Sequence, residues 1–335
     1  MGTFHNADIA KPSALKSSPK TSVAAGQGIA ADLIAVLTAV TCGDPRVLTI
    51  QDQGALPSGP FELAHRSLQS GLRAWVERQT RLPLGYVEQL YTFADKDRAG
   101  AEQQVISISY LGLTREQPAS GEYEASWRSW YVYFPWEDHR LGVPAMIEEV
   151  LKPQLQAWIA ATKDSSLRQN RAQRATITFG FDGRPWNEEL ILQRYELLYE
   201  AGLIAEAERS SAGAARHEAP VKASSAGRAM ILDHRRILAT GIARLRAKIK
   251  YHPVVFELMP ETFTLLQLQR CVEALAGRLV HKQNFRRLIE QQELVEETGQ
   301  TSQDTGGRPA KLFRFRRIVF TERAIVGTKL PISKA

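Results

Sequence analysis

Cysteine is scarce in this chain of 335 residues. The two cysteines, Cys42 and Cys271, lie far apart and form no Cys-x-x-Cys pair, which excludes a disulfide framework and a thiolate zinc cluster. Long apolar segments are missing too, because the longest run, residues 29–40, contains Asp32 and is shorter than the roughly 20 residues that span a bilayer. The first residues lack the apolar core of a secretory signal. We therefore expect a cytoplasmic protein that does not associate with membranes.

Acidic residues are outnumbered, since 43 Lys and Arg face 36 Asp and Glu, a net charge of +7. The length is greater than one small domain needs. Two stretches, residues 1–28 and 208–228, hold too few apolar residues to offset the entropy lost on ordering. We predict a flexible tail at 1–28, an insertion at 163–228 that is disordered over 208–228, and a second tail at 325–335.

Between the first tail and residue 250, hydrophobic patterns of period two and period 3.6 alternate along the chain, which predicts one α+β domain over 29–250. We predict strands at residues 33–40, 47–50, 105–110, 130–134 and 174–181, and helices at about 68–79, 187–202 and 233–250. The last of these helices is rich in Arg and Lys, and we expect those side chains, Arg235 and Arg246 among them, on its solvent face.

The residues after 250 have the order of elements found in a winged helix. Thr264 and Gln267 form a capping box at the start of a helix, and Gly277 permits a turn before a second apolar stripe that includes Phe285 and Ile289. Strand-like runs follow at 293–296 and 311–315. Helix, turn, helix and β-hairpin predict a winged helix-turn-helix domain over residues 251–324.

This domain contains two clusters of positive charge without a carboxylate. Residues 278–287 hold four Lys or Arg, and residues 308–317 hold five. Such clusters suit contacts with DNA phosphates, while the amides of Gln283 and Asn284 can read adenine edges in a major groove. A solvated basic face on a structural helix is the alternative. The predicted DNA-binding residues are Lys282, Gln283, Asn284, Arg286, Arg287, Arg308, Lys311 and Arg314.

Residues 59–80 have the spacing of the Nudix box, Gly-x5-Glu-x7-Arg-Glu-U-x-Glu-Glu-x-Gly-U, where U is a bulky apolar residue. Nudix hydrolases need carboxylates at helix positions i, i+3 and i+4 to hold Mg²⁺ or Mn²⁺ against a pyrophosphate. Those positions are Ala74, Glu77 and Arg78 here, and the earlier Glu position is His65. We therefore predict no metal site and no catalytic residues, although a turn followed by an ordinary amphipathic helix would give the same spacing.

Several motifs in order resemble the Nudix-related transcriptional regulators of NAD metabolism, the NrtR family. They are the segments 86–93, 95–98 and 105–111, Phe256-x-Leu258-x-Pro260 with Phe263-Thr264-Leu265, Lys282-x-Asn284-Phe285-Arg286-Arg287, and Gly307-Arg308-Pro309-Ala310-x-Leu312-Phe313-Arg314-Phe315. The resemblance covers roughly residues 30–135 and 230–317. Residues 186–202 are similar to a NadQ-like subgroup that controls de novo NAD synthesis.

This resemblance implies a Nudix-like α/β/α sandwich with a mixed sheet, followed by a winged helix. It implies a homodimeric repressor that binds a palindromic operator on double-stranded DNA near NAD-synthesis genes and requires no cofactor. The effector would be an adenine nucleotide, namely ADP-ribose, NAD or ATP. The effector-binding candidates that the resemblance suggests are Arg73, Glu77, Tyr91, Phe93 and Arg98.

Two other functions stay open from the residues themselves. The first is an active Nudix-type ADP-ribose pyrophosphatase with an accessory basic domain. The second is an RNA-binding protein, which would stack bases on exposed aromatic side chains. Phe313 and Phe315 alternate with Arg314 and Arg316, so we expect these two rings to face the core instead.

Overall fold

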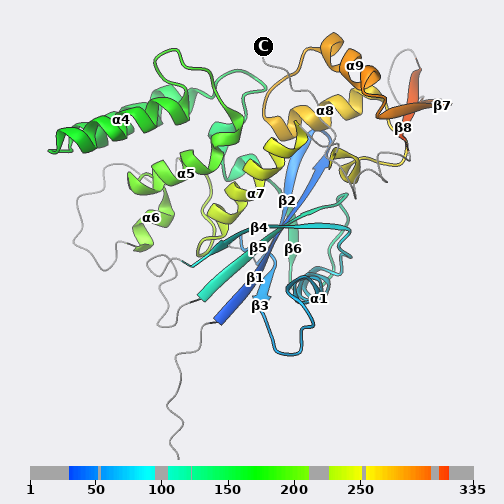
Figure 1. The fold of residues 1–335 in the computed structure, drawn as a ribbon, viewed down its shortest axis with the longest axis horizontal. Coiled ribbons are helices and arrows are strands. Elements are labelled where there is room, and N and C mark those ends of the chain that lie inside the picture. Colours follow the sequence, from blue (N-terminus) through cyan, green and yellow to red (C-terminus); the bar gives the residue numbers. More distant parts are fainter. Residues whose placement is uncertain are drawn as a thin grey trace, which may run out of the picture.

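The computed structural model describes residues 30–51, 54–94, 105–121, 123–210, 226–250, 254–302 and 309–316. The predicted tails, most of the predicted loop at 208–228, and the site candidates Arg98 and Arg308 lie outside these residues. A central sheet carries helices on both faces, and a second, smaller sheet belongs to the C-terminal domain (Figure 1). No helix within the described part of the chain is long and apolar enough to cross a membrane.

The central sheet is mixed. Its strands are β1 (Ala30–Thr41), β2 (Asp44–Ile50), β3 (Ser58–Pro60), β4 (Tyr86–Phe93), β5 (Val105–Leu113) and β6 (Ala125–Ser129). The strand order is β4-β5-β1-β2-β6, and β3 pairs with β1 beside this path. β1 and β5 run parallel, whereas the other pairs are antiparallel. The prediction of a mixed sheet is confirmed.

Helices cover the two faces of this sheet. Successive side chains of a strand point to opposite faces, so Leu33 and Leu37 of β1 pack in one cluster with helix α1 (Leu68–Thr80). Val36 lies on the other face, against Gly241 of helix α7 (His234–Ile249). The N-terminal domain is therefore the predicted α/β/α sandwich.

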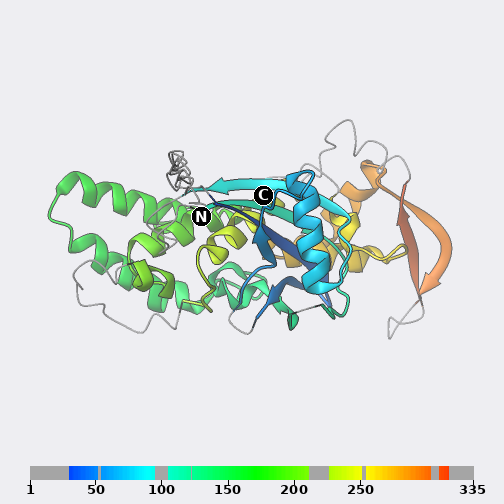
Figure 2. The same ribbon diagram turned by 90° about the horizontal axis from the view of Figure 1, so that it is seen from below.

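The segment between the sheet and α7 is helical. It comprises a π-helical turn (Ile147–Leu151), α3 (Lys152–Ala160), α4 (Ser165–Phe179), a 3-10 turn (Glu188–Leu190), α5 (Ile191–Glu200) and α6 (Ala205–Ser210). α4 packs on α3 and α5, and α5 packs on α7. Figure 2 shows α4 and α5 in green at one end of the molecule and the C-terminal hairpin, in orange and red, at the other.

Two predicted strands are wrong. The one at residues 174–181 is the end of α4, which begins at the N-cap Asp164 and ends at Gly180 in the left-handed conformation. The apolar residues alternate along the sequence there because Phe179 lies in the last helical turn and Phe181 follows the cap. The rings of these two residues stack on each other. The strand predicted at 130–134 is a 3-10 turn (Trp130–Val132) after β6, and its aromatic side chains fill the core.

The C-terminal domain has the predicted winged helix order. Its elements are a 3-10 turn (Val254–Leu258), α8 (Leu265–Ala276), α9 (Lys282–Gln291), β7 (Val295–Ser302) and β8 (Ala310–Phe315). The capping box of Thr264 and Gln267 forms, and Gly277 ends α8 with φ of 72°. Phe263 exchanges two backbone hydrogen bonds with Phe313, which adds a third extended segment beside the hairpin.

The two domains share one hydrophobic core. Buried side chains of α8, such as Leu268, belong to the same cluster as Val36 of the sheet and Leu238 of α7. Helix α8 also packs directly on β2 and α7. A displacement of the helices that pack on the sheet, such as α7, would therefore be transmitted to α8, because the interior is close-packed.

One prediction about α7 is wrong and bears on function. Arg235 and Arg246 do not lie on a solvent face, since both side chains are 0% exposed. Helical periodicity places cationic residues on a face, but it cannot tell what covers that face. Here the aromatic residues after β6 and the helical insertion cover it, and buried carboxylates neutralise both guanidinium groups.

Candidate functional site

Helix α9 presents a cationic face to solvent. Phe285 packs against the core and Ile289 is 4% exposed, so these two side chains fix the helix from one side. The opposite side carries five exposed polar and cationic side chains. They are Lys282, Gln283, Asn284, Arg286 and Arg287, all predicted as DNA-binding residues.

None of these five side chains has a hydrogen-bond or ion-pair partner among the residues that the structure describes. The first turn of α9 contains no acidic residue, and its N-cap, His281, makes no side-chain cap bond. Unpaired cations beside free N–H groups at a helix N-terminus favour contact with phosphate. In a helix-turn-helix the second helix lies in the major groove, with its N-terminal residues at the base edges. The structure brings the α9 candidates together as such a surface.

The basic cluster of the hairpin has no carboxylate within its own residues, as the sequence analysis stated. The structure nevertheless places glutamates from another segment next to it. One glutamate lies beside each basic side chain of β8 and of the residue after it: two come from β7, and Glu293 comes from the turn before β7. The ion pairs are Lys311–Glu297 at 2.8 Å, Arg314–Glu296 at 2.7 Å and Arg316–Glu293 at 3.0 Å. A phosphate that contacts Lys311 or Arg314 would therefore compete with a nearby carboxylate, and exposed ion pairs of this kind are broken at small cost.

Arg278, at the turn between α8 and α9, was counted with the first basic cluster but points toward the N-terminal domain. Its guanidinium lies 3.4 Å from Glu188, which also pairs with Lys250 at 3.0 Å. Burial opposes ionisation of Glu188, but hydrogen bonds and the two cations outweigh it and hold its pKa below the usual range. This cluster joins the domains and adds nothing to the cationic face of α9.

Helix α1 keeps the scaffold of the Nudix box. The Trp75 indole donates to the carbonyl oxygen of Pro60 at 2.8 Å, and the Gln79 amide brackets Ser58 of β3 with bonds of 3.1 and 2.7 Å. Gly59 is needed because a Cβ there would lie 2.2 Å from the Trp75 ring. The spacing between Gly59 and the helix thus serves to pack β3 on α1.

The residues of the box do not fit the divalent metal that the motif holds in Nudix hydrolases. Ala74 has no ligand atom, and the Arg78 guanidinium lies over the Trp75 ring at 3.6 Å. The His65 ring nitrogen accepts the backbone N–H of Glu62 at 3.1 Å. Within the described ranges, no group of three His, Cys, Asp or Glu side chains is placed to hold a metal ion.

The effector candidates lie on both faces of the sheet. Glu77 is exposed on α1, and Arg73 donates to the carbonyl oxygens of Leu84 and Gly85, bracing the loop after α1. Tyr91 and Phe93 lie on the α7 side, where they line a cavity of about 600 Å³. The structure therefore places only Tyr91 and Phe93 of the described candidates in one pocket.

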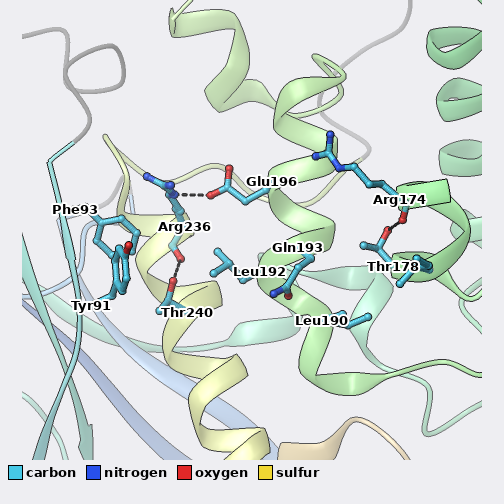
Figure 3. Close-up of a pocket in the computed structure, with 11 residues that line it drawn as sticks. Tyr91, Phe93, Arg174, Thr178, Leu190, Leu192, Gln193, Glu196, Arg236 and Thr240 are labelled. Carbon is cyan, nitrogen blue, oxygen red and sulfur yellow. Dashed lines mark hydrogen bonds and ion pairs between the residues drawn. The ribbon is translucent and has the colours of Figure 1, made fainter. Parts of the chain in front are cut away.

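Strand β4 and helices α4, α5 and α7 form this cavity, which we call the insertion pocket (Figure 3). It is lined by Tyr91, Phe93, Arg174, Ile177, Thr178, Leu190, Leu192, Gln193, Glu196, Arg236 and Thr240. The volume lies within the range of small-molecule sites. Apart from the two β4 aromatics, sequence reasoning missed these residues because they come from four separate elements.

Ionic and aromatic contacts order one wall of the insertion pocket. Arg236 pairs with Glu196 at 2.5 Å, and its guanidinium lies 4.7 Å from the centre of the Phe93 ring. Tyr91 meets Phe93 edge to face at 5.1 Å and is itself 60% exposed. On another wall Arg174 pairs with Glu200 at 2.6 Å. The pocket thus combines a free aromatic face with paired charges of both signs.

A buried carboxylate is connected to this pocket through Arg194. Glu137 is bound by Arg194 of α5, at 2.6 and 3.1 Å, and by Arg246 of α7; all three side chains are 0% exposed. Burial opposes ionisation of Glu137, but the two guanidinium groups outweigh it and hold its pKa below the usual range. We call this cluster the Glu137 triad. Arg194 also donates to the carbonyl oxygen of Thr178, a residue that lines the pocket, at 2.6 Å.

The N-terminal domain caps the C-terminus of α8. Arg246 donates through Nε to the carbonyl oxygen of Leu275 at 3.0 Å, and the Tyr131 hydroxyl donates to that of Ala274 at 2.7 Å. The backbone N–H of His139 donates to the Gly277 carbonyl at 2.7 Å. The last carbonyls of a helix lack partners within it, so these bonds fix the end of α8. A continuous set of contacts therefore links the insertion pocket, through the Glu137 triad, to the winged helix.

Comparisons with known proteins agree with this geometry. Residues 255–315 match the family described as the NrtR DNA-binding winged helix domain. The "ADPR responsive transcriptional repressor NtrR" of Acinetobacter baylyi is 41% identical over 86 residues, which cover 26% of this chain and 34% of the relative. The chain therefore spans about a third of the length of the curated relative that it matches.

Two solved structures share the overall arrangement. Shewanella oneidensis NrtR is similar over 89% of this chain and 97% of its own, with a TM-score of 0.51 and 19% identity. The same protein complexed with a 27mer DNA covers 87% and 95%, with a TM-score of 0.50 and 18% identity. We conclude that residues 255–315 match the NrtR DNA-binding winged helix domain, and that the chain shares the fold of Shewanella oneidensis NrtR, a Nudix-like domain followed by a winged helix.

Proposed function

We propose that this protein is a transcriptional repressor that binds double-stranded DNA and is controlled by a nucleotide. The observation that carries the proposal is the cationic face of α9, whose side chains are unpaired within the described part of the chain and lie in the segment that matches the NrtR winged helix. A repressor in the cytoplasm that acts on NAD-synthesis genes agrees with the family resemblance. The matched Acinetobacter baylyi protein is named as a repressor that responds to ADPR, which supports ADP-ribose as the first effector to test, followed by NAD and ATP.

We further propose that the Nudix-like domain binds without hydrolysing. Hydrolysis of a pyrophosphate in this fold requires a cluster of carboxylates around a divalent metal. At the matching positions this chain has Ala74, His65 and the stacked Arg78, so Glu77 is the one carboxylate that remains of the box. A domain of this kind can hold a nucleotide as a signal and release it unchanged.

A homodimer on a palindromic operator is the assembly we propose. A single α9 would read one half-site, and two copies related by a twofold axis would read both. Light scattering coupled to size exclusion tests the dimer. A mobility shift tests the palindrome. Two chains should bind one operator fragment, and the shift should be lost when one half-site is scrambled.

The DNA interface is tested by mobility shift on fragments upstream of the gene for this protein and of NAD-synthesis genes. Arg286→Ala and Arg287→Ala should weaken binding and lower the salt slope by about 0.9 for each phosphate contact removed. Arg184→Ala is the matched control, because Arg184 is exposed and unpaired within the described residues but lies in the helical insertion. Binding that both α9 variants leave unchanged would contradict the proposed interface.

A further inference from the structure

We propose that the insertion pocket, and not the Nudix-box helix α1, is where the nucleotide binds. This inference rests on the proposed function and assigns a place and a chemistry to its effector. Tyr91 and Phe93 face the pocket from β4 on one side, Gln193 and Leu190 lie on the other, and Leu192 lies between them (Figure 3). On the opposite face of the sheet, α1 uses Arg73, Trp75 and Gln79 for internal contacts.

The pocket offers the groups that a nucleobase needs. The Tyr91 ring is 60% exposed at its mouth, and an exposed aromatic face stacks with any base. Gln193 is exposed and has no hydrogen-bond partner among the described residues, so its amide can both donate to and accept from the edge of a base. Apolar side chains, including Leu192 and Ile177, line the space between them.

The pocket also offers groups for a ribose and for phosphates. Glu196 is a carboxylate within it, and a carboxylate accepts hydrogen bonds from both ribose hydroxyls. Arg236 and Arg174 supply guanidinium groups suited to phosphate oxygens. The hydroxyls of Thr178 and Thr240 donate to backbone carbonyls one turn earlier in their helices, at 2.8 and 3.0 Å, so toward a ligand they act as acceptors.

A ligand in this pocket would contact α5 and α7, the helices that carry Arg194 and Arg246 of the Glu137 triad. Gln193 precedes Arg194 on α5, Thr178 of α4 gives its carbonyl oxygen to Arg194, and Arg236 lies on α7 with Arg246. Arg246 in turn holds the end of α8. A nucleotide that binds one arrangement of α4, α5 and α7 more tightly than another therefore stabilises the position of the winged helix that belongs to that arrangement.

The test is isothermal titration of the full chain with ADP-ribose, NAD and ATP in turn. Tyr91→Ala should weaken binding of the nucleotide that binds best by about tenfold, and Gln193→Ala by about threefold. Tyr123→Ala removes an exposed tyrosine outside the pocket and Glu77→Gln alters α1, so both should stay within twofold of the unmodified protein. Circular dichroism checks that each variant is folded, and the exposed Gln193 provides a second variant if Tyr91→Ala unfolds.

The outcomes separate this inference from the proposed function. Loss of binding in Glu77→Gln, with Tyr91→Ala and Gln193→Ala unchanged, would place the nucleotide at α1 and overturn the inference, while nucleotide control would stand. If none of the three nucleotides binds the unmodified protein, both the inference and nucleotide control are overturned. DNA binding in the mobility shift is then still tested independently by the α9 variants.

Discussion

The Glu137 triad makes a quantitative prediction. Glu137→Gln removes the one negative charge between Arg194 and Arg246 and leaves two guanidinium groups without it in a site that excludes water. Gln has a single acceptor oxygen, so it cannot replace the two carboxylate oxygens that accept from Arg194 at 2.6 and 3.1 Å. Removing one partner of a buried ion pair costs about 3–5 kcal/mol, and we expect a loss of unfolding free energy in that range.

The measurement is urea unfolding of the full chain at pH 7, followed by tryptophan fluorescence. Glu148→Gln is the control, because it removes an exposed carboxylate of the π-helical turn that pairs with Lys152 at the start of α3 at 2.7 Å. That exposed pair is worth about 0.5 kcal/mol or less. An effect of Glu137→Gln no larger than the control would refute the reasoning that the triad is dehydrated and couples the domains.

The triad also predicts a dependence on pH. A carboxyl whose pKa is lowered by folding contributes stability above its unfolded pKa of about 4.3, and this contribution is lost as the pH falls through its folded pKa. The difference in stability between the unmodified protein and Glu137→Gln should therefore be constant near neutrality and shrink in acid. A difference that grows as the pH falls below 4 would contradict the assigned charge state.

Two further predictions concern groups outside the triad. Burial lowers the pKa of His234 to about 4, and its Nδ1 accepts the backbone N–H of Leu56 at 2.8 Å. Between pH 4 and 6.5 this histidine is therefore protonated in the unfolded chain but neutral in the folded protein. Stability should fall by about 2 kcal/mol from pH 7 to pH 5 through this group, and His234→Gln should flatten that slope in urea unfolding. Incubation with ADP-ribose and Mg²⁺ or Mn²⁺ should release no AMP, in the unmodified protein and in Glu77→Gln alike. Release of AMP that Glu77→Gln abolishes would establish the pyrophosphatase instead.

Local patterns predicted much of the fold. The capping box of Thr264 and Gln267, the turn at Gly277 and the apolar stripe of α9 gave the helix-turn-helix correctly, because each depends on contacts within a few residues. The amphipathic stripe at residues 68–79 located α1 for the same reason, since helical periodicity depends on residues three and four positions apart. The failure at residues 174–181 is also local in origin: three apolar residues at period two occur in a helix when its end and cap coincide with them.

The residues of the candidate site also fall into two groups, those that a local sequence pattern predicts and those that only tertiary contacts bring together. The cationic face of α9 follows from one helix and was predicted residue by residue, whereas the glutamates that pair with Lys311 and Arg314 come from another strand. The insertion pocket draws on β4, α4, α5 and α7, and the family resemblance suggested only Tyr91 and Phe93 among its residues. Sequence spacing carries no record of which distant elements meet, so a site built from four of them cannot be read from it.

By itself the sequence determined the order of the elements in the winged helix and the loss of the Nudix carboxylates. The tertiary structure alone decided which charges are free. Arg286 and Arg287 face solvent and have no partner among the residues described by the structure, whereas Arg246, equally basic in sequence, is buried on Glu137 and holds α8. The physical reason is that the role of a charge depends on its dehydration and on its nearest opposite charge, and both are set by residues far away in the chain.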